Sequence, residues 1–235
     1  MKPDVFYDPR EGERYVHKWG YADTRFVFDG PKTVRVTGSR YQISGFRMPG
    51  LIPFVEDIIK LPISEDDLIE ERVNYEVPNP VRNEAFETGL KSALKEGQVT
   101  SDAKARLVHS HGQLSVDEIF RVLTGGTFQR IVDVVVFPER EDDVRAIVKL
   151  AVDRDVCLIP YGGGTNVSGA LAVPEDESRT ICSVDMRRMN RILWVDKGNN
   201  LACIEAGIQG KDLEQKLGEQ GLTTGHDPDS IEFST

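Results

Sequence analysis

The pattern of apolar and polar positions is most distinctive in the second half of the chain. Residues 131–137 form an apolar run that predicts a buried strand, closed by Pro138. Residues 141–155 repeat apolar positions at helical spacing and predict an amphipathic helix. A further apolar run, residues 156–160, predicts a second strand, so residues 130–161 read as a β-α-β unit. The inward helix positions are expected to be Val144, Ile147, Val148 and Ala151.

A glycine-rich loop follows this unit, with three consecutive glycines at positions 162–164. Bare backbone N–H groups without Cβ atoms can form a concave donor surface for a phosphate. Thr165 and Asn166 add polar side chains at the rim. The run matches neither GxxxxGK[ST] nor GxGxxG, and a flexible surface turn is the alternative. The loop lies at the carboxyl end of its strand, where open α/β sheets bind ligands.

Beyond the loop, residues 180–185 predict another strand. Residues 192–196 and 201–206 predict a hairpin. Residues 210–219 predict a short helix that ends before Gly221 and buries two leucines. A polar loop occupies residues 222–235. The buried leucines of this helix are expected to be Leu213 and Leu217.

The first half of the chain predicts a mixed strand and helix region. Residues 26–28 and 33–37 alternate like two strands around the turn Asp29-Gly-Pro. Further on, the sequence predicts three helices and an acidic linker. The helices span residues 51–61, run from Asn83 to Gly97, and run from a Ser101 cap to Leu107; the linker is residues 62–80. We expect two domains, residues 1–126 and residues 127–235.

Composition narrows the function classes. The net charge of −10 argues against a general nucleic-acid or anionic-membrane binder, and no apolar run is long enough to span a bilayer. The three cysteines lie in strand-like runs and their odd number indicates free thiols. Without a CxxC pair or clustered histidines, no metal site is expected. His109 and His111 are interpreted as structural, and Trp19 and Trp194 as core residues.

The order of β-α-β unit, PxGGGTxxSG loop, strand, hairpin and helix resembles the FAD-binding domain of the vanillyl-alcohol-oxidase (PCMH) type, an α+β fold. Five longer stretches are similar to the alkyldihydroxyacetonephosphate synthases in particular. These stretches are HKWGYADTRFVF, TGSRYQISG, SHGQLSVDEIF, MNRILWVD and TTGHDPDSIEFST. The resemblance covers most of residues 17–235, and residues 62–100 are the least distinctive part.

The resemblance implies an ether-lipid enzyme that exchanges the acyl group of acyl-dihydroxyacetone phosphate for a long-chain fatty alcohol. It implies FAD used without net redox change, and His226 as a residue needed for activity. Thr165 stands where covalent relatives carry a histidine, so FAD is expected to bind non-covalently. The implied flavin contacts are Pro160, Tyr161, Gly162, Gly163, Gly164, Thr165 and Asn166, and then Asp229, Ser230, Ile231, Glu232, Phe233, Ser234 and Thr235.

Members of this family continue well past the position of Thr235, so the chain is expected to be truncated and inactive alone. The family works in peroxisomes, or in glycosomes of some protists. Peripheral contact with a membrane and a homodimer are further expectations, and nucleic acid is not expected as a partner. Two alternatives remain. One is an FAD-dependent 2-hydroxyacid dehydrogenase, which shares the glycine loop, and the other is a non-catalytic partial domain.

Overall fold

The computed structural model describes residues 5–8, 12–68, 76–112, 128–166 and 168–235. The chain forms two compact units. The first contains Met1–Tyr15 and Gly20–Val73, and the second contains Val16–Trp19 and Asn74–Thr235. Four residues near the amino end therefore belong to the larger unit. The expected boundary between residues 126 and 127 falls outside the described residues and stays a prediction, as does most of the motif SHGQLSVDEIF.

The first unit is built from short antiparallel strands and one helix. The two strands expected around the turn at Asp29 are present and pair with each other, which confirms the hairpin. Val34 and Val36 are its most buried residues. Its elements are β1 (Val5–Asp8), β2 (Gly12–Tyr15), β3 (Phe26–Phe28), β4 (Val34–Val36), β5 (Arg47–Met48), α1 (Leu51–Ile59) and the 3-10 helix η1 (Glu65–Asp67). Strand β2 pairs with β1, and β4 lies between β3 and β5.

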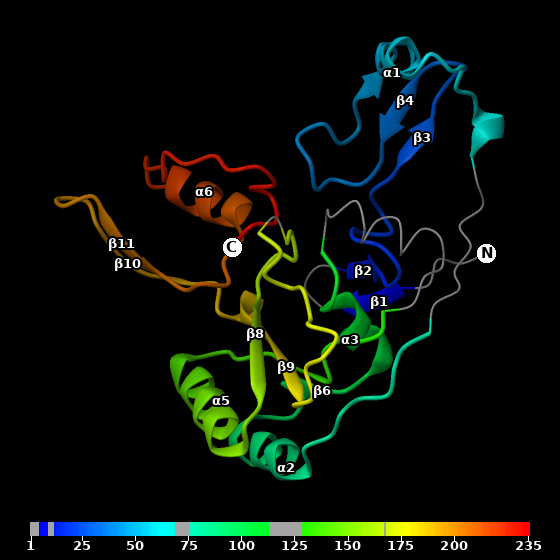
Figure 1. Ribbon diagram of the computed structural model, residues 1–235. Coiled ribbons are helices and arrows are strands. Elements are labelled where there is room, and N and C mark those ends of the chain that lie inside the picture. The colour runs from blue at the N-terminus through cyan, green and yellow to red at the C-terminus, as the bar shows by residue number, and fades with distance from the viewer. Residues whose placement is uncertain (1–4, 9–11, 69–75, 113–127, 167) are drawn as a thin grey trace. The chain divides into compact units, whose positions relative to one another are not determined.

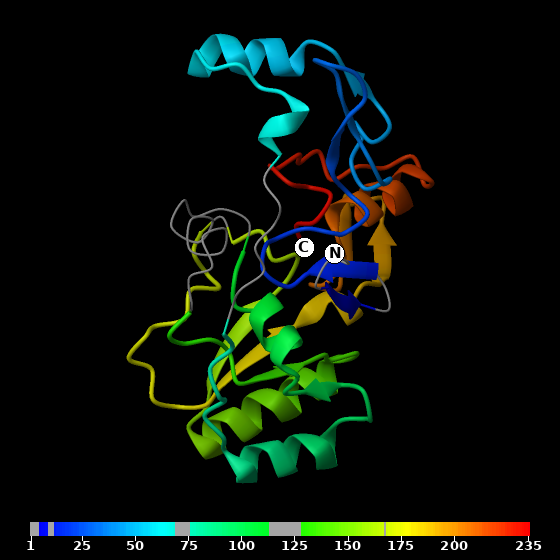
Figure 2. The same ribbon diagram turned by 90° about the vertical axis from the view of Figure 1, so that its right-hand side faces the viewer.

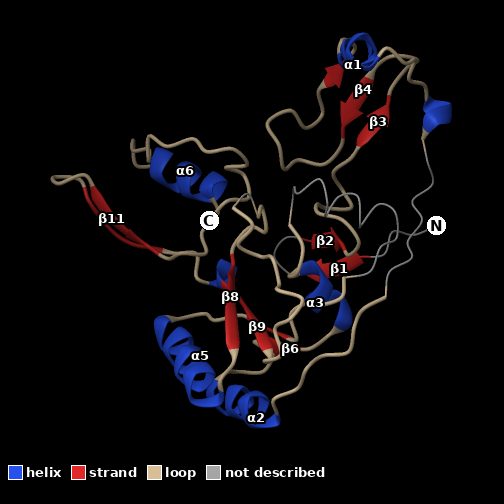
Figure 3. Cartoon of the chain, in the orientation of Figure 1, coloured by secondary structure: helices blue, strands red, loops and turns tan. Residues whose placement is uncertain are grey.

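The second unit is organised around a four-stranded sheet with the order β6-β7-β9-β8 (Figures 1 and 3). Strands β7, β9 and β8 are parallel, and β6 runs antiparallel to β7 at the edge. The expected β-α-β unit is confirmed, with β9 inserted between its two strands. The strands are β6 (Val99–Thr100), β7 (Val134–Val136), β8 (Cys157–Tyr161) and β9 (Ile181–Asp185).

Two helices, α2 (Glu84–Ala93) and α5 (Glu141–Arg154), cover one face of this sheet and lie side by side in both views (Figures 1 and 2). They touch closely, because a Cβ at Gly89 would lie 2.7 Å from Leu150 Cδ2. Successive residues of the strands alternate between the two faces, as the pleat requires. The core on the helix side contains Phe86, Leu90, Val134, Val136, Ile147, Ala151, Cys182 and Val184; the opposite core contains Val132, Val135, Ile159, Tyr161, Leu171 and Ile181.

Two expectations about helices were wrong, one about the buried face of α5 and one about the cap of a shorter helix. Val148 of α5 is 45% exposed, whereas Ile147 and Ala151 face the sheet, because the buried stripe of α5 is narrower than its apolar pattern.

The helix α3 (Ala103–Val108) is capped by Asp102 and not by Ser101. The Asp102 carboxylate accepts hydrogen bonds from the N–H groups of Lys104 and Ala105, 3.0 Å each, which satisfies two donors of the first turn.

The carboxyl-terminal part adds the hairpin of β10 (Ile192–Asp196) and β11 (Leu201–Ile204), then α6 (Gly210–Gly218). A 3-10 helix, η2 (Met186–Arg188), precedes the hairpin. Both predicted elements are confirmed, but two burial predictions were wrong. Trp194, which was expected in the core, is 54% exposed on the two-stranded hairpin. Leu217 is buried as expected, while Leu213 is only half-buried.

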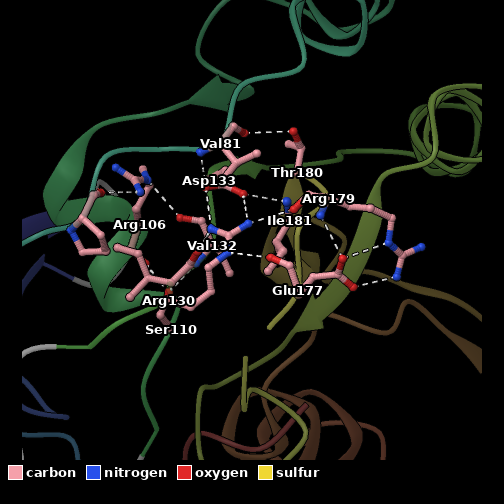
Figure 4. A network of polar contacts seen from close by, with 12 residues as sticks. Val81, Arg106, Ser110, Arg130, Val132, Asp133, Glu177, Arg179, Thr180 and Ile181 are labelled. Carbon is pink, nitrogen blue, oxygen red and sulfur yellow. Dashed lines mark hydrogen bonds and ion pairs between the residues drawn. The ribbon is translucent and has the colours of Figure 1, made fainter. Parts of the chain in front are cut away.

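A polar network ties the amino ends of β7 and β9 together (Figure 4). The buried carboxylate of Asp133 accepts hydrogen bonds from the N–H groups of Val81 and Ile181, 2.8 Å each, and forms an ion pair with Arg130. Arg106 donates to the carbonyl of Val132 at 2.9 Å. Burial lowers the pKa of Arg106, and the nearby Asp133 carboxylate opposes that shift. The network lies at the amino ends of the parallel strands, whereas the glycine loop lies at the carboxyl end of β8, so we interpret the network as structural.

The residues that the structure describes include no helix long and apolar enough to cross a membrane. They also include no group of three or more metal-ligating side chains. Each of Cys157, Cys182 and Cys203 has a free thiol, as the odd count suggested. Burial raises the pKa of the Cys182 thiol, which keeps it protonated and unreactive.

Candidate flavin site at the carboxyl end of the sheet

The glycine loop leaves β8 at Tyr161 and turns sharply. Gly164 has φ +76° and Asn166 has φ +53°, both in the left-handed region that glycine and asparagine tolerate best. The Asn166 carboxamide oxygen accepts a hydrogen bond from the N–H of Leu171 at 2.8 Å. The loop therefore has a defined turn within the described residues.

Buried backbone donors in this loop lack protein acceptors. Gly163 and Gly164 are both buried. Within the described part of the chain, no protein group accepts a hydrogen bond from either N–H. A buried N–H without an acceptor is costly and rare, so these two donors fit a bound anion such as a pyrophosphate.

The second predicted flavin segment packs directly on this loop. A Cβ placed on Gly163 would lie 1.7 Å from the carbonyl oxygen of Phe233. A Cβ on Gly162 would lie 2.1 Å from Thr235 Oγ1. Glycine is required here because the opposing segment approaches the loop backbone, and not only because a ligand would.

The helix α6 holds this second segment in place. The N–H of Gly210 donates to the carbonyl of Ser234 at 2.8 Å, and the N–H of Lys211 donates to that of Ile231 at 3.2 Å. These carbonyls satisfy donors of the first helical turn that have no partner within the helix. Ser230, with φ +60°, begins the turn and its carbonyl accepts from Phe233 N at 2.9 Å. Of the segment's residues, Phe233 is buried and Asp229 and Thr235 are exposed.

A segment that the predicted site did not include also lies against the loop. A Cβ on Gly112 would lie 2.0 Å from Asn166 Cβ, so the backbone at Gly112 contacts the loop. Next to it, His111 is 3% exposed, and its Nε2 lies 2.9 Å from the carbonyl oxygen of Val16. The motif SHG was visible in the sequence, but only the fold shows that it adjoins the glycines.

A buried charged cluster underlies the start of the loop. His109 Nε2 lies 2.9 Å from Asp185 Oδ2, and His109 Nδ1 lies 2.7 Å from the carbonyl of Ala105. Both partners of the ring are oxygen atoms that can accept a hydrogen bond. Asp185 also accepts from the Arg187 guanidinium at 2.5 Å. The ring of Tyr161 lies 4.4 Å from that of His109, centroid to centroid.

Opposing effects set the pKa of Asp185. Burial alone would raise it, but the Arg187 guanidinium and the His109 hydrogen bond outweigh burial and hold the pKa well below the usual range. Asp185 is therefore a carboxylate that fixes α3 to the end of β9. Tyr161 is fully buried within this cluster, so its ring offers no exposed surface to a cofactor. His109 and His111 are both buried and hydrogen-bonded, which fits their structural interpretation.

His226 lies on an exposed loop that α6 supports. Glu214 of α6 accepts hydrogen bonds from the hydroxyl of Thr223 at 2.8 Å and from the N–H of Thr224 at 3.0 Å. The threonine hydrogen bonds, from Thr224 first, lower the pKa of Glu214. The loop is held at its start, while the imidazole of His226 is accessible to a ligand. Its catalytic role stays a prediction.

Comparison with known proteins agrees with this geometry. Residues 132–235 match a family model described as an FAD binding domain. The chain thus carries part of an FAD-binding domain of the vanillyl-alcohol-oxidase (PCMH) type, and FAD is the cofactor of that domain. Within this class its sequence and structure are similar to the alkyldihydroxyacetonephosphate synthases, which confirms the resemblance seen in its motifs.

The similarity extends over nearly the whole chain. A synthase of that name from Caenorhabditis elegans is 36% identical over 92% of this chain, and one from Trypanosoma brucei brucei is 37% identical over 92%. A solved alkyldihydroxyacetonephosphate synthase structure superposes with a TM-score of 0.78 at 33% identity over 94% of this chain. The chain spans 36% of the C. elegans protein, 35% of the T. brucei protein and 42% of the solved chain.

Proposed function

We propose that this chain supplies the pyrophosphate-binding part of an ether-lipid synthase that exchanges the acyl group of acyl-dihydroxyacetone phosphate for a fatty alcohol. One observation carries the proposal. The two segments expected to contact the flavin, residues 160–166 and 229–235, meet at Gly163 and Phe233, which are 70 positions apart in the sequence. Two buried N–H donors at that junction, on Gly163 and Gly164, fit the charge of a pyrophosphate.

The residues of the chain would divide the work as follows. The N–H groups of Gly163 and Gly164 would bind the pyrophosphate, and Thr165 would add its hydroxyl at the rim. Bound FAD would supply covalent catalysis, which divides one hard substitution into two easier steps. The exposed His226 would hold or move a proton at its imidazole while the carboxylate leaves and the alcohol enters. Thr165 offers no imidazole for a covalent flavin link, so binding would be non-covalent.

The family resemblance supports the remaining assignments. Acyl-dihydroxyacetone phosphate and a long-chain fatty alcohol would be the substrates, and the enzyme would act in peroxisomes or glycosomes. A homodimer and a peripheral membrane contact belong to the same proposal. The 235 residues alone would be marginally stable, because the hairpin leaves Leu193, Trp194 and Leu201 more than half exposed. They would bind FAD weakly and catalyse no exchange, because they span only 36% of the length of the C. elegans synthase.

Product analysis of the full-length protein that contains residues 1–235 tests the function. With FAD and acyl-dihydroxyacetone phosphate, a labelled fatty alcohol should appear in an alkyl ether product, and no electron acceptor should be consumed. Reduction of an acceptor that depends on a 2-hydroxyacid, without ether product, would favour the dehydrogenase instead. The 235-residue chain is assayed in parallel. A yellow, cooperatively folded short chain with measurable exchange would show that the active site has been misplaced.

A further inference from the structure

Residues 16–19 are separated in sequence from the unit they join. They belong to the larger compact unit, although the residues before and after them belong to the smaller one. Val16 is fully buried and His17 is 7% exposed. A short segment buried this deeply has a packing role that the matched family model, which begins at residue 132, does not include. We call residues 16–19 the strap.

The first contact of the strap leads to the glycine loop. The carbonyl of Val16 lies 2.9 Å from His111 Nε2, a hydrogen bond between groups 95 residues apart in the sequence. His111 precedes Gly112, whose backbone lies against Asn166 of the loop. The imidazole of His111 also stacks on Phe128 at a centroid distance of 6.3 Å. The strap therefore fixes the residue that adjoins the glycine loop.

The second contact of the strap leads to the other flavin segment. The ring of Trp19 meets the ring of Phe233 edge to face, with centroids 5.0 Å apart and an interplanar angle of 90°. This is a favourable geometry for an aromatic pair. Phe233 is 3% exposed, and its carbonyl is the atom that approaches Gly163. Trp19 therefore contacts the residue at which the two flavin segments meet.

We propose that the strap positions both flavin segments, and that Trp19 is a positioning residue for FAD binding through Phe233. Trp19 is not proposed to touch the reacting atoms. Its ring would keep Phe233 in place, and the Phe233 carbonyl would in turn hold Gly163 at the distance that the pyrophosphate requires. The inference rests on the proposed FAD binding, and it adds four residues from the amino-terminal region to the flavin domain.

The chain offers a matched control for this role. Trp19 and Trp194 are its two tryptophans, and Trp194 lies 54% exposed on the β10–β11 hairpin. The variants Trp19→Ala, Trp19→Phe and Trp194→Ala are made in the full-length protein that contains residues 1–235. Trp19→Phe retains an aromatic ring and should therefore retain near-normal FAD binding. If Trp19→Ala fails to fold, Trp19→Leu, which keeps an apolar side chain but loses the ring, replaces it.

Two measurements read out the role. Flavin fluorescence titration should show a dissociation constant for FAD at least about tenfold higher in Trp19→Ala, near-normal in Trp19→Phe and unchanged in Trp194→Ala. Hydrogen exchange without FAD should show faster exchange in residues 160–166 and 231–235 of Trp19→Ala, with α2 and α5 unchanged. An aromatic residue that only fills space would speed exchange throughout the unit instead.

The outcomes separate this inference from the proposed function. If the wild-type protein binds no FAD, the proposed function fails, while hydrogen exchange still tests the strap. If the wild type binds FAD and Trp19→Ala binds equally well with unchanged exchange in both segments, the strap role is overturned. Equal losses in Trp19→Ala and Trp194→Ala would overturn it too, since they would show a general effect of losing a tryptophan.

Discussion

The carbonyl of Phe233 lies directly against Gly163, so closely that a Cβ on the glycine would stand 1.7 Å from the carbonyl oxygen. This contact joins two segments that each predict a flavin contact and that no local sequence pattern connects. It also makes the loop sensitive to substitution in the absence of any ligand, because real Cβ atoms do not approach other atoms so closely.

Gly163→Ala should therefore separate the two segments and weaken FAD binding by at least about tenfold, which corresponds to about 1.4 kcal/mol. The measurement is a flavin fluorescence titration of the purified variant. Gly218→Ala is the control, because a Cβ at Gly218, in the last turn of α6, would meet nothing within 4 Å. Normal FAD affinity in Gly163→Ala would remove this junction from the flavin site.

His226→Ala should leave folding and FAD binding unchanged, because the side chain is exposed. In the full-length protein it should lower alkyl exchange by roughly a hundredfold, the scale of a lost acid–base group. The measurement compares the turnover number with the FAD dissociation constant and the thermal transition of the same preparation. Asp227→Ala, at the neighbouring exposed position, is the control. Turnover close to wild type would make His226 an ordinary solvated loop residue.

Asp185→Asn should destabilise the fold by about 3–5 kcal/mol, because it leaves the buried charge of Arg187 without its carboxylate. The effect has a pH signature. The pKa of Asp185 is lowered in the folded chain, so its stabilisation is fully present above the unfolded pKa, about 4, and is lost as the pH falls through the lower folded value.

The measurement is urea unfolding of both proteins between pH 2 and pH 7. The difference in unfolding free energy between wild type and Asp185→Asn should be constant above about pH 5 and should shrink in strong acid. Asp153→Asn on the surface of α5, where the carboxylate pairs with Lys149, should cost less than about 1 kcal/mol. A difference independent of pH down to pH 2 would contradict the ion-pair interpretation of the cluster.

Asp133→Ala should destabilise the chain by about 3 kcal/mol or more, because the N–H groups of Val81 and Ile181 and the Arg130 guanidinium lose one common acceptor. The FAD affinity of the folded variant should not change, because the network lies at the amino ends of the strands and the glycine loop lies at the carboxyl end of β8. Thermal unfolding and FAD titration on one sample check both statements. A selective loss of FAD affinity would show that the two ends of the parallel strands are coupled.

The local sequence pattern predicted helices and strands well where the element buries one face and exposes the other. Helix α5 and the hairpin near Asp29 followed from periodicity and turn chemistry. Burial was predicted less well where it depends on what packs on an element. Trp194 is exposed although its strand is apolar, and Asp143 of α5 is buried because Gln98 and Arg140 pair with it. Apolar content alone does not show which face receives a neighbour.

The candidate site was predicted in its segments but not in its assembly. The glycine loop and the segment containing Phe233 were both identified by resemblance, whereas their contact requires the register of β9 and the placement of α6. The His109–Asp185 pair joins residues 76 positions apart, and no spacing rule connects them. The burial of Val16 and His17 likewise depends on tertiary contacts, which no local pattern in the sequence predicts.

The insertion of β9 between β7 and β8 has a consequence for the order of folding. Strand β8 hydrogen-bonds only to β9 among the described strands, and residues 162–180 separate the two. On a ribosome, β8 would therefore emerge before its partner, and the two strands could pair only after residues 162–180 had been synthesised. Closing a loop of this length costs only a few kcal/mol of chain entropy, growing as the logarithm of its length. The turn at Gly164 and Asn166 lies within this closing segment, so the residues of the candidate ligand site also connect β8 to the strand that completes its pairing.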